Sequence, residues 1–265
     1  MSWVELVTTF NLFTSISWIL AGIISAIIST LFLKKNPKKR LNQLFSAGFI
    51  SWSLSLLFNG LNFAVAYSSL IAADIFRDLC VVTGVFSSLL LFVATIGIYF
   101  GAERLNWIIY LVFGAFGIAV SIVGLLNDWV TTDGLGGFKT TDNLLGKTFT
   151  QIIPAVFVIA GAIFLVLTYF SLENKLAKKR IGYFIIGFST IILGLLMFLV
   201  DSLVNTSPYI FPSLAIVTWV TGPILVLVGF YVKVDASNEV TTHTIGKAET
   251  KTLDPKQNYN IERPS

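Results

Sequence analysis

Charged side chains are scarce in this sequence. Only 12% of its 265 residues are Asp, Glu, Lys or Arg, whereas 55% belong to the hydrophobic set. An ordinary soluble domain carries about 25% charged residues. This deficit excludes a normal water-facing surface and predicts a protein that is embedded in a membrane.

Histidine and cysteine are almost missing. His243 is the only histidine, which excludes haem held by two histidines, the usual His and carboxylate zinc site, and Ser/His catalysis. Cys80 is the only cysteine, so no intramolecular disulfide can form. The only lysine of the last apolar run, Lys233, stands at its end, where it cannot hold a retinal. We expect no metal and no cofactor, and the lack of a defensible acid and base pair leans against an enzyme without excluding one.

Long apolar runs are what the sequence has in place of charge. About 20 helical residues cross the roughly 30 Å of a bilayer core. The runs do not alternate in polarity as barrel strands do, and backbone groups in hydrocarbon must bond within their own segment, so we read them as helices. The sequence predicts an all-α, seven-helix transmembrane bundle with spans at about 10–33, 42–66, 79–100, 106–126, 149–170, 181–204 and 209–232.

Basic residues gather in alternate connections. Fifteen of the 18 Lys and Arg residues follow the first, third, fifth and seventh spans, and the remaining three are Arg77, Lys139 and Lys147. The positive-inside bias therefore predicts an outer N-terminus and a cytoplasmic C-terminus. We interpret the basic runs as topology signals of a multi-pass protein of the cell membrane. The expected partner is the lipid bilayer, and no nucleic acid is expected to bind.

Two polar segments stand out, one inside the predicted transmembrane domain of residues 1–233 and one after it. Residues 127–148 form the longest outer connection, and its "DGLGG" predicts turns or a short hairpin, acting either as a lid or as a solvated connector. Residues 234–265 have too little apolar content to offset the entropy of ordering. We expect them to form a disordered cytoplasmic tail, which either docks a partner or is simply solvated.

A polar stripe follows one face of the second span. Gly48, Ser51, Ser55, Asn59 and Asn62 recur at steps of three and four residues. The small and hydroxyl members are typical of close helix packing, whereas the two asparagines need hydrogen-bond partners in lipid.

The candidate ligand-binding residues fall at one predicted depth, in the outer third of the bundle. They are Asn59, Asn62, Arg77, Asp78 and Asp201, with Trp219 nearer the membrane centre. Asp74, Arg77 and Asp78 fall within about one helical turn, which permits a local pairing of the arginine with a carboxylate. Asp201 either faces the interior and pairs with Arg77 or the asparagines at the floor of an outward-facing pocket, or reaches water at its helix end.

The last span also carries a candidate hinge. Gly222 and Pro223 stand in "TGP", where proline removes a backbone donor and kinks or hinges a helix. Such kinks also occur in membrane helices that do not move, and Trp219 beside them could serve either a pocket or plain packing.

Three stretches resemble a known family. "KKRLNQLFSAGFISWSLSLL", "FRDLCVVTGVFSSLLLF" and "KKRIGYFIIGF" are similar to the seven-helix sensor module at the N-terminus of many prokaryotic membrane histidine kinases. The resemblance covers about residues 5–233 and implies a sensor with an outer N-terminus. The chain departs from that pattern because a short tail stands in place of a phosphoacceptor helix and an ATP-binding domain, so output would pass to a separate partner.

Three functions therefore stay open from the sequence. The first is a receptor-like or sensor-like membrane protein that binds a small-molecule stimulus in its outer third and signals to a cytoplasmic or membrane partner. The second is a small-solute transporter with alternating access. The third is a structural subunit of a membrane complex, whose polar stripe packs against other helices.

Overall fold

The structure is a computed structural model that describes residues 3–126, 128–132, 138–140, 148–204 and 210–232. Side chains are described for residues 12–126, 128–130, 148–149, 152–200 and 214–232. The predicted tail at 234–265 and the "DGLGG" stretch at 133–137 lie outside the described residues.

The described chain is helical apart from one short pair of strands, and seven of its helices are long and apolar enough to cross a membrane. These are α1 (Trp3–Lys35), α2 (Arg40–Val65), α3 (Leu70–Phe100), α4 (Trp107–Leu125), α6 (Ile153–Ser171), α7 (Lys175–Val204) and α8 (Ile210–Tyr231). The short elements are the 3₁₀ turn η1 (Ala102–Arg104), the strands β1 (Val130–Thr132) and β2 (Phe138–Thr140), and the π-helical turn η2 (Thr148–Ile152).

All seven predicted helices are present, and the largest error in their bounds is at the start of α3. This helix begins at Leu70 rather than at 79, capped by the Ser69 side chain, which accepts from the backbone N–H of Ala72 at 3.2 Å. The charged residues in its first turns interrupt the apolar run, so hydropathy alone places the start too late. Arg77 and Asp78 consequently lie two turns inside a helix instead of in a link.

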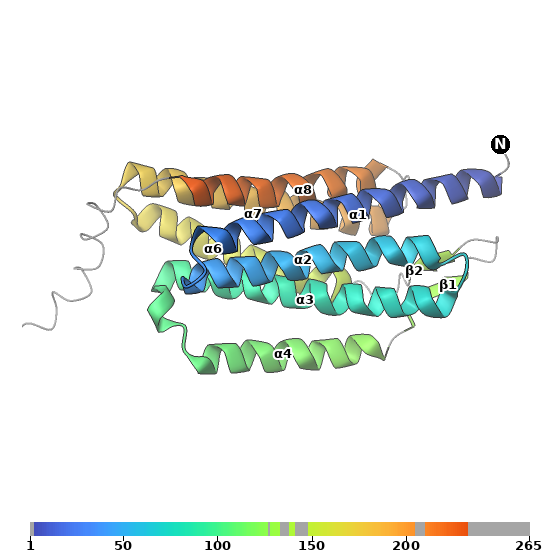
Figure 1. The fold of residues 1–265 in the computed structure, drawn as a ribbon, viewed down its shortest axis with the longest axis horizontal. Helices are drawn as coiled ribbons and strands as arrows, with labels where there is room; N and C mark the ends of the chain where they lie inside the picture. Colours follow the sequence, from blue (N-terminus) through green and yellow to red (C-terminus); the bar gives the residue numbers. More distant parts are fainter. Residues whose placement is uncertain (1–2, 127, 133–137, 141–147, 205–209, 233–265) are drawn as a thin grey trace, which may run out of the picture.

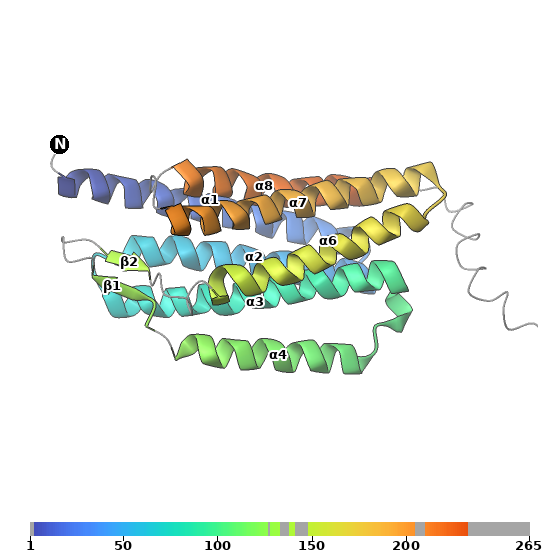
Figure 2. The same cartoon turned by 180° about the vertical axis from the view of Figure 1, so that it is seen from behind.

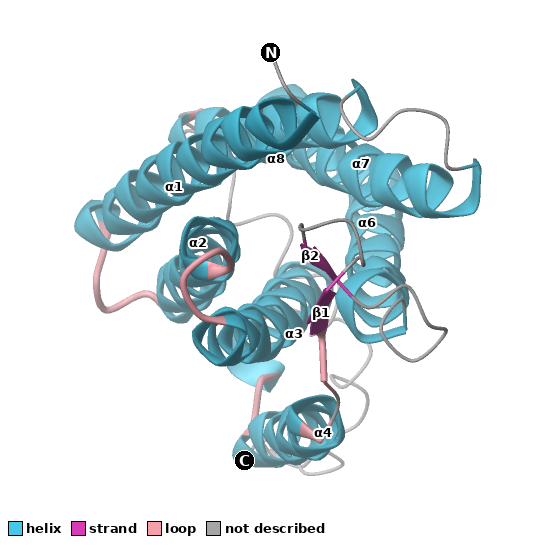
Figure 3. Ribbon diagram, turned by 90° about the vertical axis from the view of Figure 1, so that its right-hand side faces the viewer, coloured by secondary structure: helices cyan, strands magenta, loops and turns pink. Residues whose placement is uncertain are grey.

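Six of the helices close a ring. Figure 3 views the bundle from one end, and α1, α2, α3, α6, α7 and α8 follow one another around it. Helix α4 packs outside the ring against α3, as Figures 1 and 2 also show. Only Gly117, Ser121 and Gly124 of α4 are buried. The ring encloses the space in which a site can form, and α4 takes no part in it.

Small residues hold neighbouring ring helices close together. Ser53 Oγ donates to the Gly22 carbonyl at 2.7 Å, and Ser87 Oγ donates to the Gly48 carbonyl at 2.9 Å. A Cβ at Gly48 would lie 2.8 Å from the Leu91 side chain. For Gly48 this agrees with the packing role expected of the stripe on α2.

The two ends of the bundle differ in composition. At one end lie the links after α1, α3 and α6 with their basic residues, and we call it the basic end. There the Lys35 ammonium donates to the Phe230 carbonyl and lies 4.5 Å from the centre of the Phe230 ring, joining the last turn of α1 to that of α8. We call the opposite end, which carries β1 and β2, the hairpin end.

The expected hairpin is present between α4 and α6. Strand β1 pairs antiparallel with β2, with Val130 opposite Thr140 and Thr132 opposite Phe138. In the end view of Figure 3 the hairpin lies beside α3 and α6, at the same end of the ring as the start of α3. It is therefore positioned near any cavity that opens toward this end.

Candidate functional site

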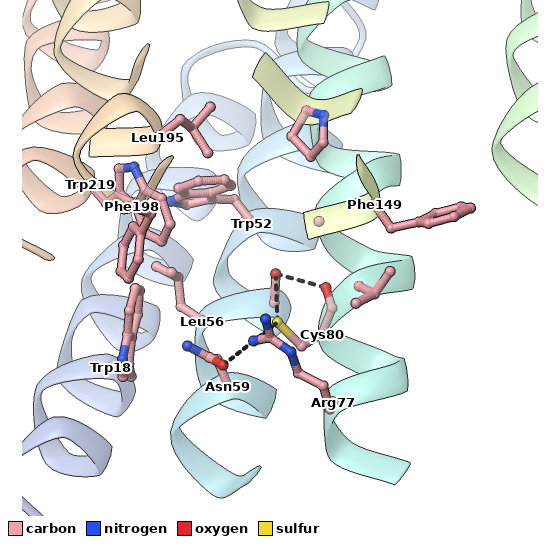
Figure 4. Close-up of a pocket in the computed structure, with 14 residues that line it drawn as sticks. Trp18, Trp52, Leu56, Asn59, Arg77, Cys80, Phe149, Leu195, Phe198 and Trp219 are labelled. Carbon is pink, nitrogen blue, oxygen red and sulfur yellow. Dashed lines mark hydrogen bonds between the residues drawn. The ribbon is translucent and has the colours of Figure 1, made fainter. Parts of the chain in front are cut away.

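A cavity of about 90 Å³ lies inside the ring, in its hairpin-end half, and all six ring helices contribute to its lining. We call it the ring cavity. One side of its wall is polar and the other is aromatic, and Figure 4 shows the two sides facing each other. The residues that line it are Trp18, Trp52, Ser55, Leu56, Asn59, Arg77, Cys80, Val81, Gly84, Phe149, Pro154, Leu195, Phe198 and Trp219.

The polar side is built around Arg77 of α3. Its Nη1 donates to Asn59 Oδ1 at 2.6 Å, which links α3 to the polar stripe of α2. Arginine carries only donors, so the oxygen of the Asn59 amide must face it and the amide nitrogen, another donor, points elsewhere. Arg77 Nε is buried and makes no hydrogen bond among the described residues. The guanidinium therefore has donor capacity to spare.

Ser55 and Cys80 complete this side. Ser55 Oγ donates to the Cys80 carbonyl at 2.9 Å and lies 3.5 Å from Cys80 Sγ, while Arg77 Nη1 lies 3.9 Å from the same sulfur (Figure 4). Gly84 sits one turn further along α3, where a Cβ would approach Ser55 Oγ to 3.1 Å. These contacts fix the rotation of α3 against α2 and keep Arg77 facing the cavity.

The aromatic side comes from α1, α2, α7 and α8. The ring of Trp219 lies 5.1 Å from that of Trp18, 5.0 Å from that of Trp52 and 4.9 Å from that of Phe198, measured between centroids. Trp219 Nε1 donates to the Ile191 carbonyl at 3.2 Å. Trp52 is 6% exposed, and its Nε1 has no hydrogen-bond partner in the described chain. The cluster offers flat apolar surface and one unused donor.

Three of the predicted site residues line the ring cavity, namely Asn59, Arg77 and Trp219. The pairing of Arg77 with a carboxylate one turn away, which the sequence allowed, is not formed. Among the described residues neither Asp74 nor Asp78 bonds to Arg77, because both carboxylates bind the segment that leads into the hairpin.

Asp74 and Asp78 anchor the start of the hairpin to α3. Asp74 Oδ1 accepts from the backbone N–H of Trp129 at 2.7 Å and of Val130 at 3.1 Å. Asp78 Oδ1 accepts from Trp129 Nε1 at 2.8 Å. Trp129 is 1% exposed, and its ring stands edge-on to that of Phe149 at 6.4 Å. Since Phe149 also lines the ring cavity, the hairpin and the cavity share a wall.

Asn62 and Asp201 stand apart from the other candidates. Asn62 is fully buried, lies outside the lining of the cavity, and has no hydrogen-bond partner for either amide atom among the described residues. Asp201 belongs to helix α7, but its side chain lies outside the described residues. Its pairing with Arg77 or with the asparagines therefore stays a prediction.

The candidate hinge on α8 is a point of very close packing. A Cβ at Gly222 would lie 2.9 Å from the Gly187 carbonyl oxygen, and a Cβ at Gly187 would lie 2.7 Å from the Gly222 carbonyl oxygen. Pro223 follows inside the same helix, which continues to Tyr231. Gly222 is thus required for α7 and α8 to approach each other, and a hinge at Pro223 would have to bend beside this contact.

Replacing Asn62 by leucine is expected to stabilise the protein. A buried amide without partners costs about 1–3 kcal/mol, and leucine has a similar volume without that cost. The measurement is the thermal unfolding midpoint of both proteins in lipid nanodiscs, with Asn59→Leu as the matched comparison, because Asn59 is bonded to Arg77 and its loss should lower the midpoint. A lower midpoint for Asn62→Leu would mean that Asn62 has a partner that the described contacts do not include.

Comparison with known proteins adds no relative. No family model matches the chain, and no curated protein is significantly similar to it.

Proposed function

We propose that the chain is a receptor-like or sensor-like protein of the cell membrane, which binds a small-molecule stimulus in the ring cavity. The observation that carries the proposal is the cavity itself. It combines Arg77 and Asn59 on one wall with the tryptophan cluster on the other, and no packing need explains an arginine with unused donors. Ionisable residues inside membrane helices mark ligand or ion sites by default.

The orientation belongs to the same proposal. The positive-inside bias assigns the basic end to the cytoplasm, so the hairpin end and the ring cavity would face outward. A ligand bound more tightly by one arrangement of the six ring helices would shift their population. The basic end would then present the change to a cytoplasmic or membrane partner, as the resemblance to kinase sensor modules implies.

A transporter is the second candidate, and one observation favours it. Pro223 lies inside α8 next to the close contact between Gly187 and Gly222, so bending of α8 would move the Trp219 wall of the cavity. Alternating access requires such a moving wall.

Thermal unfolding in nanodiscs tests the proposal. The wild type is screened against ions, amino acids, nucleosides, quinones and small organic acids, and a binder at a hundredfold excess over its Kd should stabilise it by about 2.7 kcal/mol. Trp219→Leu should lose the response, whereas Trp107→Leu, which alters a tryptophan 69% exposed on α4, should keep it.

Uptake of the same binder into proteoliposomes separates the two candidates. A binder that is not transported supports the sensor, and saturable uptake supports the transporter. If no compound stabilises the wild type, while another membrane protein co-purifies in a fixed ratio, the chain is a structural subunit and the proposal is wrong.

A further inference from the structure

The ring cavity has a distinct chemical bias, because its unused polar atoms are almost all donors. Arg77 keeps guanidinium N–H groups free, its Nε among them, and the Asn59 amide is turned so that its nitrogen remains available. Trp52 adds an indole N–H with no partner in the described chain and is itself more than nine-tenths buried. A ligand that satisfies these atoms must present acceptors.

The charge in the cavity is also one-sided. Among the residues whose side chains are described, no carboxylate lies within ion-pair distance of Arg77, since Asp74 and Asp78 bind Trp129 and Val130. Arg77 is half-buried, so water screens its charge only in part, and its planar guanidinium matches a carboxylate through two parallel hydrogen bonds. The described part of the polar side is therefore complementary to an anion.

The rest of the cavity is lined by apolar side chains and suits a ligand with a compact apolar group. Trp18, Trp52, Trp219 and Phe198 cover the wall opposite Arg77, and Leu56 lies between the two sides (Figure 4). The volume is about 90 Å³. An engineered apolar cavity of about 150 Å³ takes benzene, so this one suits a smaller body, such as a short branched alkyl group.

We propose that the ligand of the ring cavity is a small organic acid, with its carboxylate on Arg77 and Asn59 and its short apolar body against the tryptophans of the opposite wall. This assignment rests on the proposed function and adds the chemical class of the ligand. The proposed function and the ligand class can fail separately. A neutral ligand in the same cavity would contradict the organic acid but would still support a sensor.

Isobutyrate and isobutyramide form the decisive pair of probes, since they have the same shape and differ in charge. Both are titrated into the wild-type protein in phosphatidylcholine nanodiscs, and binding is followed by the unfolding midpoint and by tryptophan fluorescence. Isobutyrate should bind about 10 to 100 times more tightly than the amide, which is the loss expected when hydrogen bonds to a charged group are removed. Equal binding of the two, or binding of the amide alone, would overturn the anion assignment while supporting the cavity as a ligand site.

Variants of Arg77 locate the effect. Arg77→Gln should abolish the preference for isobutyrate over isobutyramide, and Arg77→Lys should restore part of it. Arg104→Gln, which removes an exposed arginine at the basic end, should leave it unchanged. An unchanged preference in Arg77→Gln would contradict the proposal, and if that variant fails to fold, the comparison of acid and amide on the wild type still decides.

A lipid headgroup could supply an anion to the same donors, and bilayer composition distinguishes the two sources. Replacing part of the phosphatidylcholine by phosphatidylglycerol should change the Kd of isobutyrate by no more than about threefold. This value is corrected for the surface potential that depletes anions near the bilayer. Full displacement of isobutyrate by phosphatidylglycerol would overturn the assignment to a water-borne acid.

Discussion

Gly187→Leu is expected to push α7 away from α8 and to destabilise the bundle strongly. A Cβ at this position would lie 2.6 Å from Val226 Cγ2, 2.7 Å from the Gly222 carbonyl oxygen and 3.0 Å from the Val226 backbone nitrogen, so backbone as well as a side chain blocks it. Overpacking of a tight interior costs about 1–3 kcal/mol and sometimes more. We expect leucine to reach or exceed the upper value, measured as a lower unfolding midpoint in nanodiscs and a lower yield of monodisperse protein.

Gly114→Leu is the matched control for this experiment. Gly114 lies on α4, and no atom stands within 4 Å of a Cβ built there. The same change of glycine to leucine should therefore leave the free energy of unfolding within about 0.5 kcal/mol of the wild-type value, which is typical of surface substitutions. Equal losses at Gly114 and Gly187 would show that the effect comes from membrane insertion or expression instead of from the contact between α7 and α8.

Asp74→Ala is expected to release the start of the hairpin from α3. The carboxylate accepts two backbone N–H groups, those of Trp129 and Val130, and each hydrogen bond to a charged group contributes about 1.5–3 kcal/mol. With the acceptor gone, Trp129 keeps its indole hydrogen bond to Asp78 and its ring contact with Phe149. Hydrogen exchange measured by mass spectrometry should show faster exchange at residues 129 and 130, and tryptophan fluorescence should shift toward the emission of a solvated indole.

Two further variants make the result specific. Asp74→Asn keeps an acceptor oxygen at the same place and should give an intermediate exchange rate, while Glu103→Ala removes an exposed acid at the basic end and should change nothing. If ligand binding in the ring cavity also weakens in Asp74→Ala, the shared wall at Phe149 transmits the change. Wild-type exchange rates in Asp74→Ala would show that the strand pairing of Val130 with Thr140 holds this segment without the carboxylate.

Hydropathy was sufficient to predict the seven helices, because each apolar run is long enough to cross a bilayer by itself. It failed at the start of α3 for a physical reason. Asp74, Arg77 and Asp78 find their partners on other elements, namely Trp129, Val130 and Asn59, and no local rule predicts those partners. A helix can carry charge through its first turns when tertiary contacts satisfy it, and the sequence alone shows only the charge.

The predicted residues that line the cavity are Asn59 and Arg77 on its polar side and Trp219 on its aromatic side, whereas Trp18 and Trp52 were not predicted. Asn59 and Arg77 were recognisable because polar groups at membrane depth need partners. Trp18 and Trp52 carried a weaker signal, which is that tryptophan normally gathers at the membrane interface, whereas these two stand well inside their helices. Bringing them together with Trp219 requires the rotation and the order of the six ring helices, which are set by packing across the bundle and not by periodicity.

The unequal lengths of α3 and α4 have a consequence for the choice of membrane. At about 1.5 Å per residue, the 31 residues of α3 extend well beyond a hydrocarbon layer of about 30 Å, whereas the 19 residues of α4 barely match it. Helix α4 lies outside the ring and buries only small residues, so its neighbours hold it weakly. Tilting shortens the span of a helix across the bilayer, so it cannot help α4 to cross a thicker hydrocarbon layer. Either the lipid around α4 becomes thinner or α4 slides along α3. The hydrophobic thickness of the host membrane thus acts on this protein through its two shortest spans, α4 outside the ring and α6 within it, which has the same 19 residues.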